Sequence, residues 1–293
     1  MKNKQFLPWI ILFLTLLGSI PIILHNKGYT SARIIGVLVV VSAIAALWFW
    51  RVNTRKKSPR KERVRLSVND KHWLKEKISF YKRLKKSDQI IFEDRVGIFL
   101  ADVIITEIGK EQTEKTTALY VASSAVIAFW GLPYFNYGNL REVLVYPSNF
   151  DMDNTLNKHG VVNGKVHHGG LMNNTMILSL PALVKGFQID NDKKNVGIHE
   201  FAHLLDKSNG SIDGVPEYLG EEDKKIWIQL MKDAMDKINN DDSTIPAYGG
   251  TSEAEFFAVV TTYYKECPHL LKVKHRPLFE FLEAYFNDEK NKQ

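Results

Sequence analysis

Cysteine is nearly absent from this sequence, which excludes the class of small disulfide-stabilised proteins. Cys267 is the only cysteine among 293 residues, so no disulfide framework can stabilise the fold. Internal repeats and low-complexity tracts are also absent. Because 45% of the residues are hydrophobic and 25% are charged, the chain is not intrinsically disordered. Cys267 stands directly before Pro268 at the end of a helical pattern, and it is interpreted as a small buried residue rather than a nucleophile.

Charged residues are absent from two stretches near the N-terminus, residues 6–24 and 34–50. Each stretch is apolar and can cross a hydrocarbon core of about 30 Å as a helix. The sequence therefore predicts a transmembrane hairpin with spans at about 6–24 and 31–50. A cleaved signal peptide is the alternative for the first stretch, but no A-x-A cleavage site follows it.

Basic residues follow the second stretch directly, since residues 51–65 contain eight Lys or Arg and one acidic residue. By the positive-inside rule this segment is cytoplasmic. We therefore expect a multi-pass protein of the bacterial inner (cytoplasmic) membrane, with its catalytic domain facing the cytoplasm. The predicted organisation is a hairpin at 1–50, a basic juxtamembrane linker at 51–70 and one domain at 71–293.

The formal net charge of +6 is unevenly distributed along the chain. Residues 51–65 contribute +7 and residues 1–50 contribute +4, which leaves −5 for residues 66–293. A basic flank suits anionic lipid headgroups, whereas a mildly acidic domain gives nucleic-acid binding no electrostatic support. We therefore expect a membrane as a partner and no nucleic acid.

The rest of the chain is predicted to form an α+β domain, mainly helical with a small sheet. Strand-like segments occur at 103–109, 142–150 and 174–180. The uncharged run 116–135 raises the question of a third span, but its threonines, serines and proline favour a buried core helix. So few strands among many helices do not fit the regular alternation of a doubly wound sheet. Helices are expected at 71–84, 87–102, 114–131, 195–208, 221–239, 252–266 and 275–287.

The strongest chemical signal is the segment NVGIHEFAHLLD at residues 195–206. On a helix, His199 and His203 lie on one face, one turn apart, and can share a metal ion. Neutral imidazole suits zinc, and a catalytic zinc site has three protein ligands and leaves a fourth position to water. Glu200 can accept a proton from that water as it attacks a carbonyl group. Asp206 falls on the histidine side, where it either orients a ligand or is a solvated residue at the helix end.

A third ligand is expected on the helix that begins near Ser252. Glu255 is the first candidate, but Ser252-x-x-Glu255 is also a capping-box pattern, which would direct that carboxylate to backbone amides. If Thr251 caps the helix instead, Glu255 is free to reach inward. Glu253 is the second candidate and could equally be an exposed acid of the first turn. The spacing alone leaves these alternatives open.

Several segments in the same order resemble the Mlc titration factor A family of zinc metallopeptidases. They are LREVLVYPSNF, MILSLPALVKG, NVGIHEFAHLLD, DGVP and AYGGTSEAEFFAVVTTYYKECP, and the similarity covers roughly residues 72–287. The resemblance implies a fold akin to lethal-factor-type metallopeptidases. It also implies specific roles: zinc ligands His199, His203 and Glu255, the catalytic base Glu200, and Tyr248 as an active-site tyrosine whose hydroxyl can donate to a developing oxyanion.

The sequence departs from the family pattern in two places. The predicted hairpin is an addition, so we expect a membrane-anchored form of the family. The stretch VHHGGLMNNTMILSL stands where the family has a tryptophan-containing pattern. It includes His167 and His168, for which a second metal site is an alternative to solvated loop histidines.

Two functions fit these features. The first is a membrane-anchored peptidase with one zinc ion per chain, hydrolysing peptide or protein substrates at the cytoplasmic face. The second is a binding protein that sequesters a transcriptional regulator at the membrane. The presence of both Glu200 and Tyr248 favours catalysis, because a pure binding module would not need them. A protease acting within the lipid is excluded, since the charged segment DNDKKN directly precedes the motif.

Overall fold

In the computed structural model, the chain divides into two compact units, Met1–Arg60 and Lys61–Gln293. The structure describes residues 41–42, 63–132, 137, 140–148, 164–167, 174–206, 213–216 and 219–287, with the backbone alone at 164–167. Apart from residues 41–42, the predicted hairpin lies outside the described residues, as do most of the predicted basic linker and His168.

The predicted membrane location is contradicted. Within the described part of the chain, no helix combines the length and the apolar character needed to cross a membrane. A spanning helix needs about 20 predominantly apolar residues. Helix α9 (Glu221–Asn239) has 19 residues but is rich in charge, and the apolar helix α6 (Lys115–Ala128) has only 14. The multi-pass inner-membrane location predicted from the sequence is therefore withdrawn.

A four-stranded sheet with the order β1-β2-β4-β3 forms one layer of the second unit. Strands β1 (Ile104–Glu107), β2 (Glu142–Tyr146) and β4 (Thr175–Ser179) run parallel. Strand β3 (Gly164–His167) pairs antiparallel with β4 at the edge. In β2, alternate side chains are buried, because successive residues of a strand face opposite sides of the sheet.

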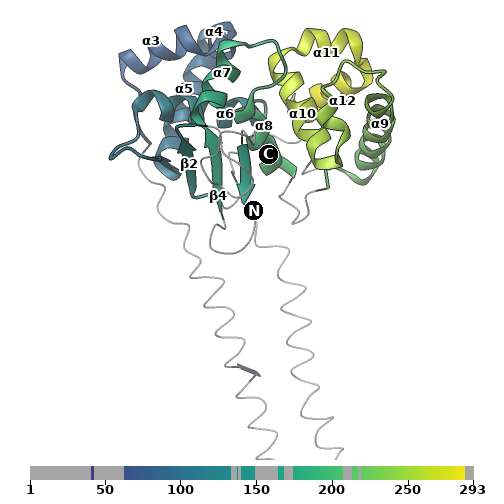
Figure 1. Ribbon diagram of the computed structural model, residues 1–293, viewed down its shortest axis with the longest axis horizontal. Helices are drawn as coiled ribbons and strands as arrows, with labels where there is room; N and C mark the ends of the chain where they lie inside the picture. The colour runs from purple at the N-terminus through teal and green to yellow at the C-terminus, as the bar shows by residue number, and fades with distance from the viewer. Residues whose placement is uncertain are drawn as a thin grey trace, which may run out of the picture. The chain divides into compact units, whose positions relative to one another are not determined.

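Helices form the remainder of the unit and fall into two groups (Figure 1). One group, α3 to α7, lies with the sheet, the other comprises α9 to α12, and α8 lies between them. The predicted α+β fold, mainly helical with a small sheet, is thus confirmed for the described residues. The elements not yet bounded are α3 (Val68–Lys77), α4 (Ser79–Arg83), α5 (Lys86–Asp102), α7 (Leu180–Gln188), α8 (Val196–Asp206), η3 (Ala247–Gly250), α10 (Glu253–Glu266), α11 (Pro268–Lys274) and α12 (Arg276–Asn287).

Three helices differ from the sequence prediction, and one of them, α7, follows β4 where no helix was expected. The helix expected at 71–84 is divided at Ile78, which has an extended backbone and is both the C-cap of α3 and the N-cap of α4. The Ile78 side chain is fully buried, so packing accounts for the break. Helix α11 was not predicted. It begins at Pro268, because proline is favourable in the first turn of a helix.

Helix α6 is the buried centre of the unit, which answers the question of a third span in favour of a core helix. Ten of its 14 residues are buried. Helix α8 lies very close to it, since a Cβ added to Gly197 would overlap the side chain of Ser124. This close approach fixes the helix that carries the histidine motif against the core.

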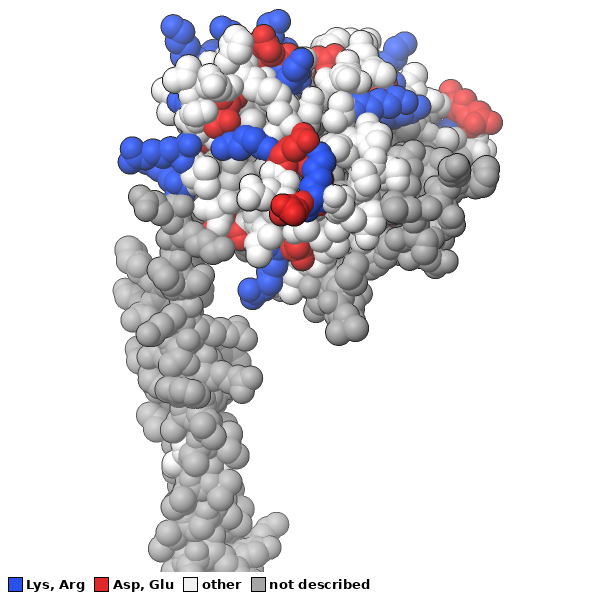
Figure 2. Space-filling model, turned by 60° about the vertical axis from the view of Figure 1, so that its left-hand side comes forward, with Lys and Arg blue, Asp and Glu red and all other residues white. Residues whose placement is uncertain are grey.

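Polar contacts attach α3 to the same core. The Lys71 ammonium lies 2.6 Å from a Glu93 carboxylate oxygen, and the Lys115 ammonium lies 3.4 Å from one of Asp70. Figure 2 shows basic and acidic side chains intermixed on one face of the molecule. The lysine of each pair is exposed to solvent, and ion pairs at the surface each contribute only about 0–1 kcal/mol. Apolar packing is therefore the main source of stability.

Candidate metal centre

Helix α8 presents both histidines of the motif on one face. The His199 and His203 rings lie with their centroids 4.9 Å apart and nearly perpendicular, at 88°. The N-terminus of the helix is capped by Asn195, whose side-chain oxygen accepts the backbone N–H of Ile198 at 3.1 Å. The one-turn spacing predicted from the sequence is therefore present in the folded chain.

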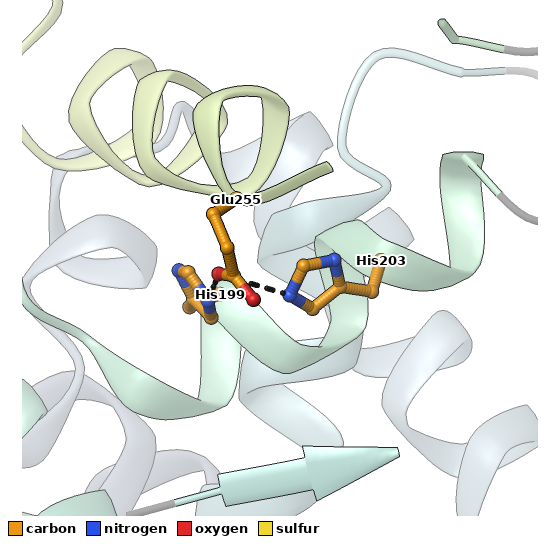
Figure 3. A group of neighbouring side chains, drawn as sticks. All are labelled: His199, His203 and Glu255. Carbon is orange, nitrogen blue, oxygen red and sulfur yellow. Dashed lines mark hydrogen bonds and ion pairs between the residues drawn. The ribbon is translucent and has the colours of Figure 1, made fainter. Parts of the chain in front are cut away.

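Helix α10 supplies the carboxylate that meets these rings. Glu255 points from α10 between the two histidines of α8 (Figure 3). Its Oε2 lies 2.9 Å from Nε2 of His199 and 3.5 Å from Nε2 of His203. Glu253 is exposed. Of the two candidates for a third ligand, the structure thus brings Glu255 to the histidines.

The two roles considered for Glu255, at the capping-box position and as a metal ligand, are compatible. Ser252 caps α10, because its hydroxyl accepts the backbone N–H of Glu255 at 3.2 Å. A complete capping box would also need the Glu255 side chain to return to the Ser252 backbone. That side chain instead turns inward to the histidines, so Glu255 holds the capping-box position without closing the box.

The donor set fits a zinc ion. One ligand atom from each of His199, His203 and Glu255 lies within 4.8 Å of the others. Tetrahedral zinc with ligands at about 2.0–2.2 Å would hold these atoms about 3.3–3.6 Å apart. The pairs at 2.9 and 3.5 Å need only small side-chain shifts to reach that spacing. Two imidazoles and one carboxylate also leave a fourth position for water, as in catalytic zinc sites.

Electrostatic coupling among these groups is strong. Burial raises the pKa of the Glu255 carboxyl, but hydrogen bonds from His199 and His203 outweigh burial and place it well below the usual range. Burial lowers the pKa of His203, yet its hydrogen bond to Glu255 and the charges of Glu200 and Glu255 raise it above its ordinary value. The site therefore favours an ionised carboxylate, the form that binds a cation.

Glu200 lies beside the first histidine and is 6% exposed. Burial is the main cause that raises the pKa of its carboxyl, opposed by the positive charges of His199 and His203. A carboxylate in such surroundings binds protons more readily than one in water.

Tyr248 reaches the site from the short helix η3. Its ring centroid lies 5.9 Å from that of His199, close enough for the charges of Glu255 and Glu200 to act on the phenol. Burial, together with the charge of Glu255, raises the pKa of the phenol to about 12, so it keeps its proton at neutral pH. The residue is 57% exposed, which leaves it accessible from solvent.

Asp206 is fully buried at the end of α8, so the solvated interpretation is wrong. Its carboxylate accepts the backbone N–H of Gly214 at 3.0 Å and that of Asp213 at 3.3 Å. Burial raises the pKa of this carboxyl to about 6. The segment DGVP contains an Asp-Gly pair, which predicts a turn with positive φ at glycine, and Gly214 has a φ of +72°.

Comparison with known proteins identifies the family. The chain matches the family described as glucose-regulated metallo-peptidase M90 over residues 50–287. An uncharacterized protein of Synechocystis sp. is 27% identical over 228 residues, 73% of this chain and 83% of that protein. Mlc titration factor A of Pectobacterium atrosepticum is 26% identical over 216 residues, 69% of this chain and 77% of that protein.

A third relative, Mlc titration factor A of Yersinia enterocolitica, is 32% identical over 162 residues, 51% of this chain and 59% of that protein. The resemblance to the Mlc titration factor A family is thereby confirmed. Because the family match spans most of the sequence, this chain belongs to the glucose-regulated metallo-peptidase M90 family.

Proposed function

We propose that this protein is a zinc-dependent peptidase that binds one zinc ion through His199, His203 and Glu255. We assign the catalytic domain to residues 71–293. A metallo-peptidase family implies a bound metal and a hydrolytic reaction. The observation that carries the proposal is the convergence of two imidazole nitrogens and a carboxylate oxygen from two separate helices.

A zinc ion in this position would act as a Lewis acid towards the scissile carbonyl and lower the pKa of a water molecule. Glu200 is assigned the role of general base, since it is adjacent to His199 and shielded from solvent. In that role it accepts the proton released as water attacks the carbonyl carbon, and then passes it to the departing amine.

Tyr248 is assigned to stabilise the negative charge that develops on the carbonyl oxygen. Its hydroxyl keeps its proton at neutral pH and can donate a hydrogen bond. Its exposure allows contact with a bound peptide, and its ring lies beside that of His199 at the edge of the metal site.

A second candidate function follows from the names of the relatives. Two of them are called Mlc titration factor A, a name that describes capture of another protein. For this chain, the corresponding function is binding of a transcriptional regulator. Binding alone would not require a shielded Glu200 beside paired histidines, so catalysis is the preferred function, and a regulator could be bound in addition.

Peptide turnover by the purified full chain tests the proposal. A defined mixture of peptides is incubated with the zinc-loaded protein, with the protein after chelation, and after zinc is restored. We expect hydrolysis that chelation abolishes and zinc restores, and mass spectrometry of the products identifies the bond cleaved. Hydrolysis that persists after complete zinc removal would contradict the metal mechanism. Complete inactivity with zinc bound would favour the binding function.

A further inference from the structure

The end of helix α8 is tied to a turn that belongs to no helix. Asp206, its last residue, is fully buried and accepts two backbone N–H groups, from Gly214 at 3.0 Å and from Asp213 at 3.3 Å. Hydrogen bonds to an ionised acceptor are about twice as strong as those between neutral groups. Asp206 therefore fixes the turn at residues 213–214 relative to the end of the histidine helix.

The same turn rests on the start of helix α10. Gly214 has a φ of +72°, and a Cβ added there would overlap the backbone carbonyl of Glu253. The contact therefore needs glycine both for its conformation and for its lack of a side chain. Glu253 is only two positions before Glu255, so the turn lies against the part of α10 that carries the carboxylate of the metal site.

Trp227 of α9 also holds the turn. Its indole N–H donates to the carbonyl of Gly214 at 2.7 Å, and its side chain is fully buried. Its ring lies 5.9 Å, centroid to centroid, from Phe256 and at the same distance from Phe257, both on α10. Two side chains therefore hold the turn by hydrogen bonds: Asp206 of α8, and Trp227, whose ring packs on α10.

We propose that Asp206 is a positioning residue for the metal site, acting through the 213–214 turn to set the position of Glu255 relative to His199 and His203. The inference rests on the proposed zinc-peptidase function. A ligand carried on a separate helix must be located within a few tenths of an ångström, because Zn–O and Zn–N distances vary little. Through this turn, Asp206 connects the two ligand-bearing helices.

The test compares four variants of the full chain with the wild type. Asp206→Ala removes the connection, Asp206→Asn keeps one acceptor oxygen, and Gly214→Ala disturbs the other end of the contact. Asp102→Ala is the matched control, because Asp102 is also the last residue of its helix but is exposed. Zinc affinity is measured against a competing chelator, and amide hydrogen exchange is measured on the metal-free proteins.

We expect Asp206→Ala and Gly214→Ala to weaken zinc binding by about tenfold or more, the effect typical of residues that orient metal ligands. Asp206→Asn should lie between Asp206→Ala and the wild type, and Asp102→Ala should match the wild type. Exchange should accelerate at residues 253–256 in the metal-free Asp206→Ala protein. If this variant does not fold, Asp206→Asn and Gly214→Ala carry the comparison.

Unchanged zinc affinity in the folded Asp206 and Gly214 variants would overturn the positioning role. A wild type that binds no zinc would instead refute the proposed function, and hydrogen exchange would then decide the inference by itself. Unaltered exchange at residues 253–256 would show that Asp206 does not fix the start of α10.

Discussion

Glu255 takes part in two interactions, one within its own helix and one with the neighbouring helix α8. Its backbone N–H is capped by Ser252, while its carboxylate meets the histidines of α8. Glutamine serves equally well at the capping-box position, so Glu255→Gln separates the two interactions. It leaves the cap intact and removes the anionic oxygen from the proposed ligand set.

We predict that Glu255→Gln lowers zinc affinity by more than about 100-fold, since residues that merely orient ligands already change affinity by about 10–100-fold. Glu253→Gln should leave zinc binding unchanged. Ser252→Ala should cost about 1 kcal/mol of stability through loss of the cap. Chelator competition and urea denaturation measure both quantities. Equal zinc affinity in Glu255→Gln and the wild type would remove Glu255 from the ligand set.

Glu200 is predicted to be required for turnover and dispensable for metal binding. In Glu200→Gln the amide cannot accept a proton from water, yet both neighbouring imidazoles remain. We expect peptide hydrolysis to fall by about 100-fold or more, with one zinc ion per chain retained. Zinc content and steady-state turnover are measured on the same preparation. Near-normal turnover would mean that another group acts as the base.

At the scale of helices, Glu266 at the end of α10 lies near the start of α8. Its carboxyl is buried close to the backbone of Lys194 and Asn195, directly before the histidine helix. Burial, with the nearby charge of Asp192, raises the pKa of this carboxyl from 4.5 to about 8. Near pH 7 the folded chain therefore holds a proton there that the unfolded chain has released.

This coupling predicts a pH-dependent stability. Because the pKa is raised on folding, the stabilisation is complete below about pH 4.5 and is lost as the pH rises towards 8. Glu266→Gln, which stays neutral, should be more stable than the wild type at pH 8 by more than about 1 kcal/mol, since one pKa unit corresponds to about 1.4 kcal/mol. Urea denaturation from pH 5 to 9 tests this. The exposed Glu222→Gln is the control, and parallel wild-type and Glu266→Gln profiles would contradict the prediction.

Helix positions were predictable from sequence where local signals and packing agree. Helix α9 spans the predicted residues 221–239, and Ser252, one of the two candidate caps, caps α10. The break at Ile78 was not predictable, because it depends on where a single side chain is buried in the tertiary structure. Pro268 follows the predicted helix 252–266 and begins a further helix, α11, for which the sequence contains no separate pattern.

In the candidate site, too, some features follow from local sequence and others depend on tertiary contacts. The pairing of His199 with His203 follows from helical spacing alone, so the sequence predicts it. Glu255 lies 56 positions from His199, and spacing could not decide between it and Glu253. The role of Asp206 depends on a turn that meets it only in the folded chain. Contacts between distant segments are set by the whole fold, and a local pattern does not contain them.

At the scale of the molecule, a metal held by both α8 and α10 should stabilise the folded chain. A ligand that binds only the native state adds about 4 kcal/mol when its concentration is about 1,000 times Kd. We predict that chelation lowers Tm and that zinc restores it in the wild type. The same cycle should have little effect on a His199→Ala, His203→Ala double variant. Differential scanning calorimetry measures this, and a Tm that does not respond to zinc would contradict the prediction.

The central claim is that His199, His203 and Glu255 together bind one zinc ion. Anomalous X-ray diffraction from crystals of the zinc-loaded protein, collected on both sides of the zinc absorption edge, tests it most directly. We expect one strong peak per chain, about 2.0–2.2 Å from Nε2 of each histidine and from a carboxylate oxygen of Glu255. A fully loaded crystal without a peak between these three side chains, or with its peak at other residues, would show that they do not form the zinc site.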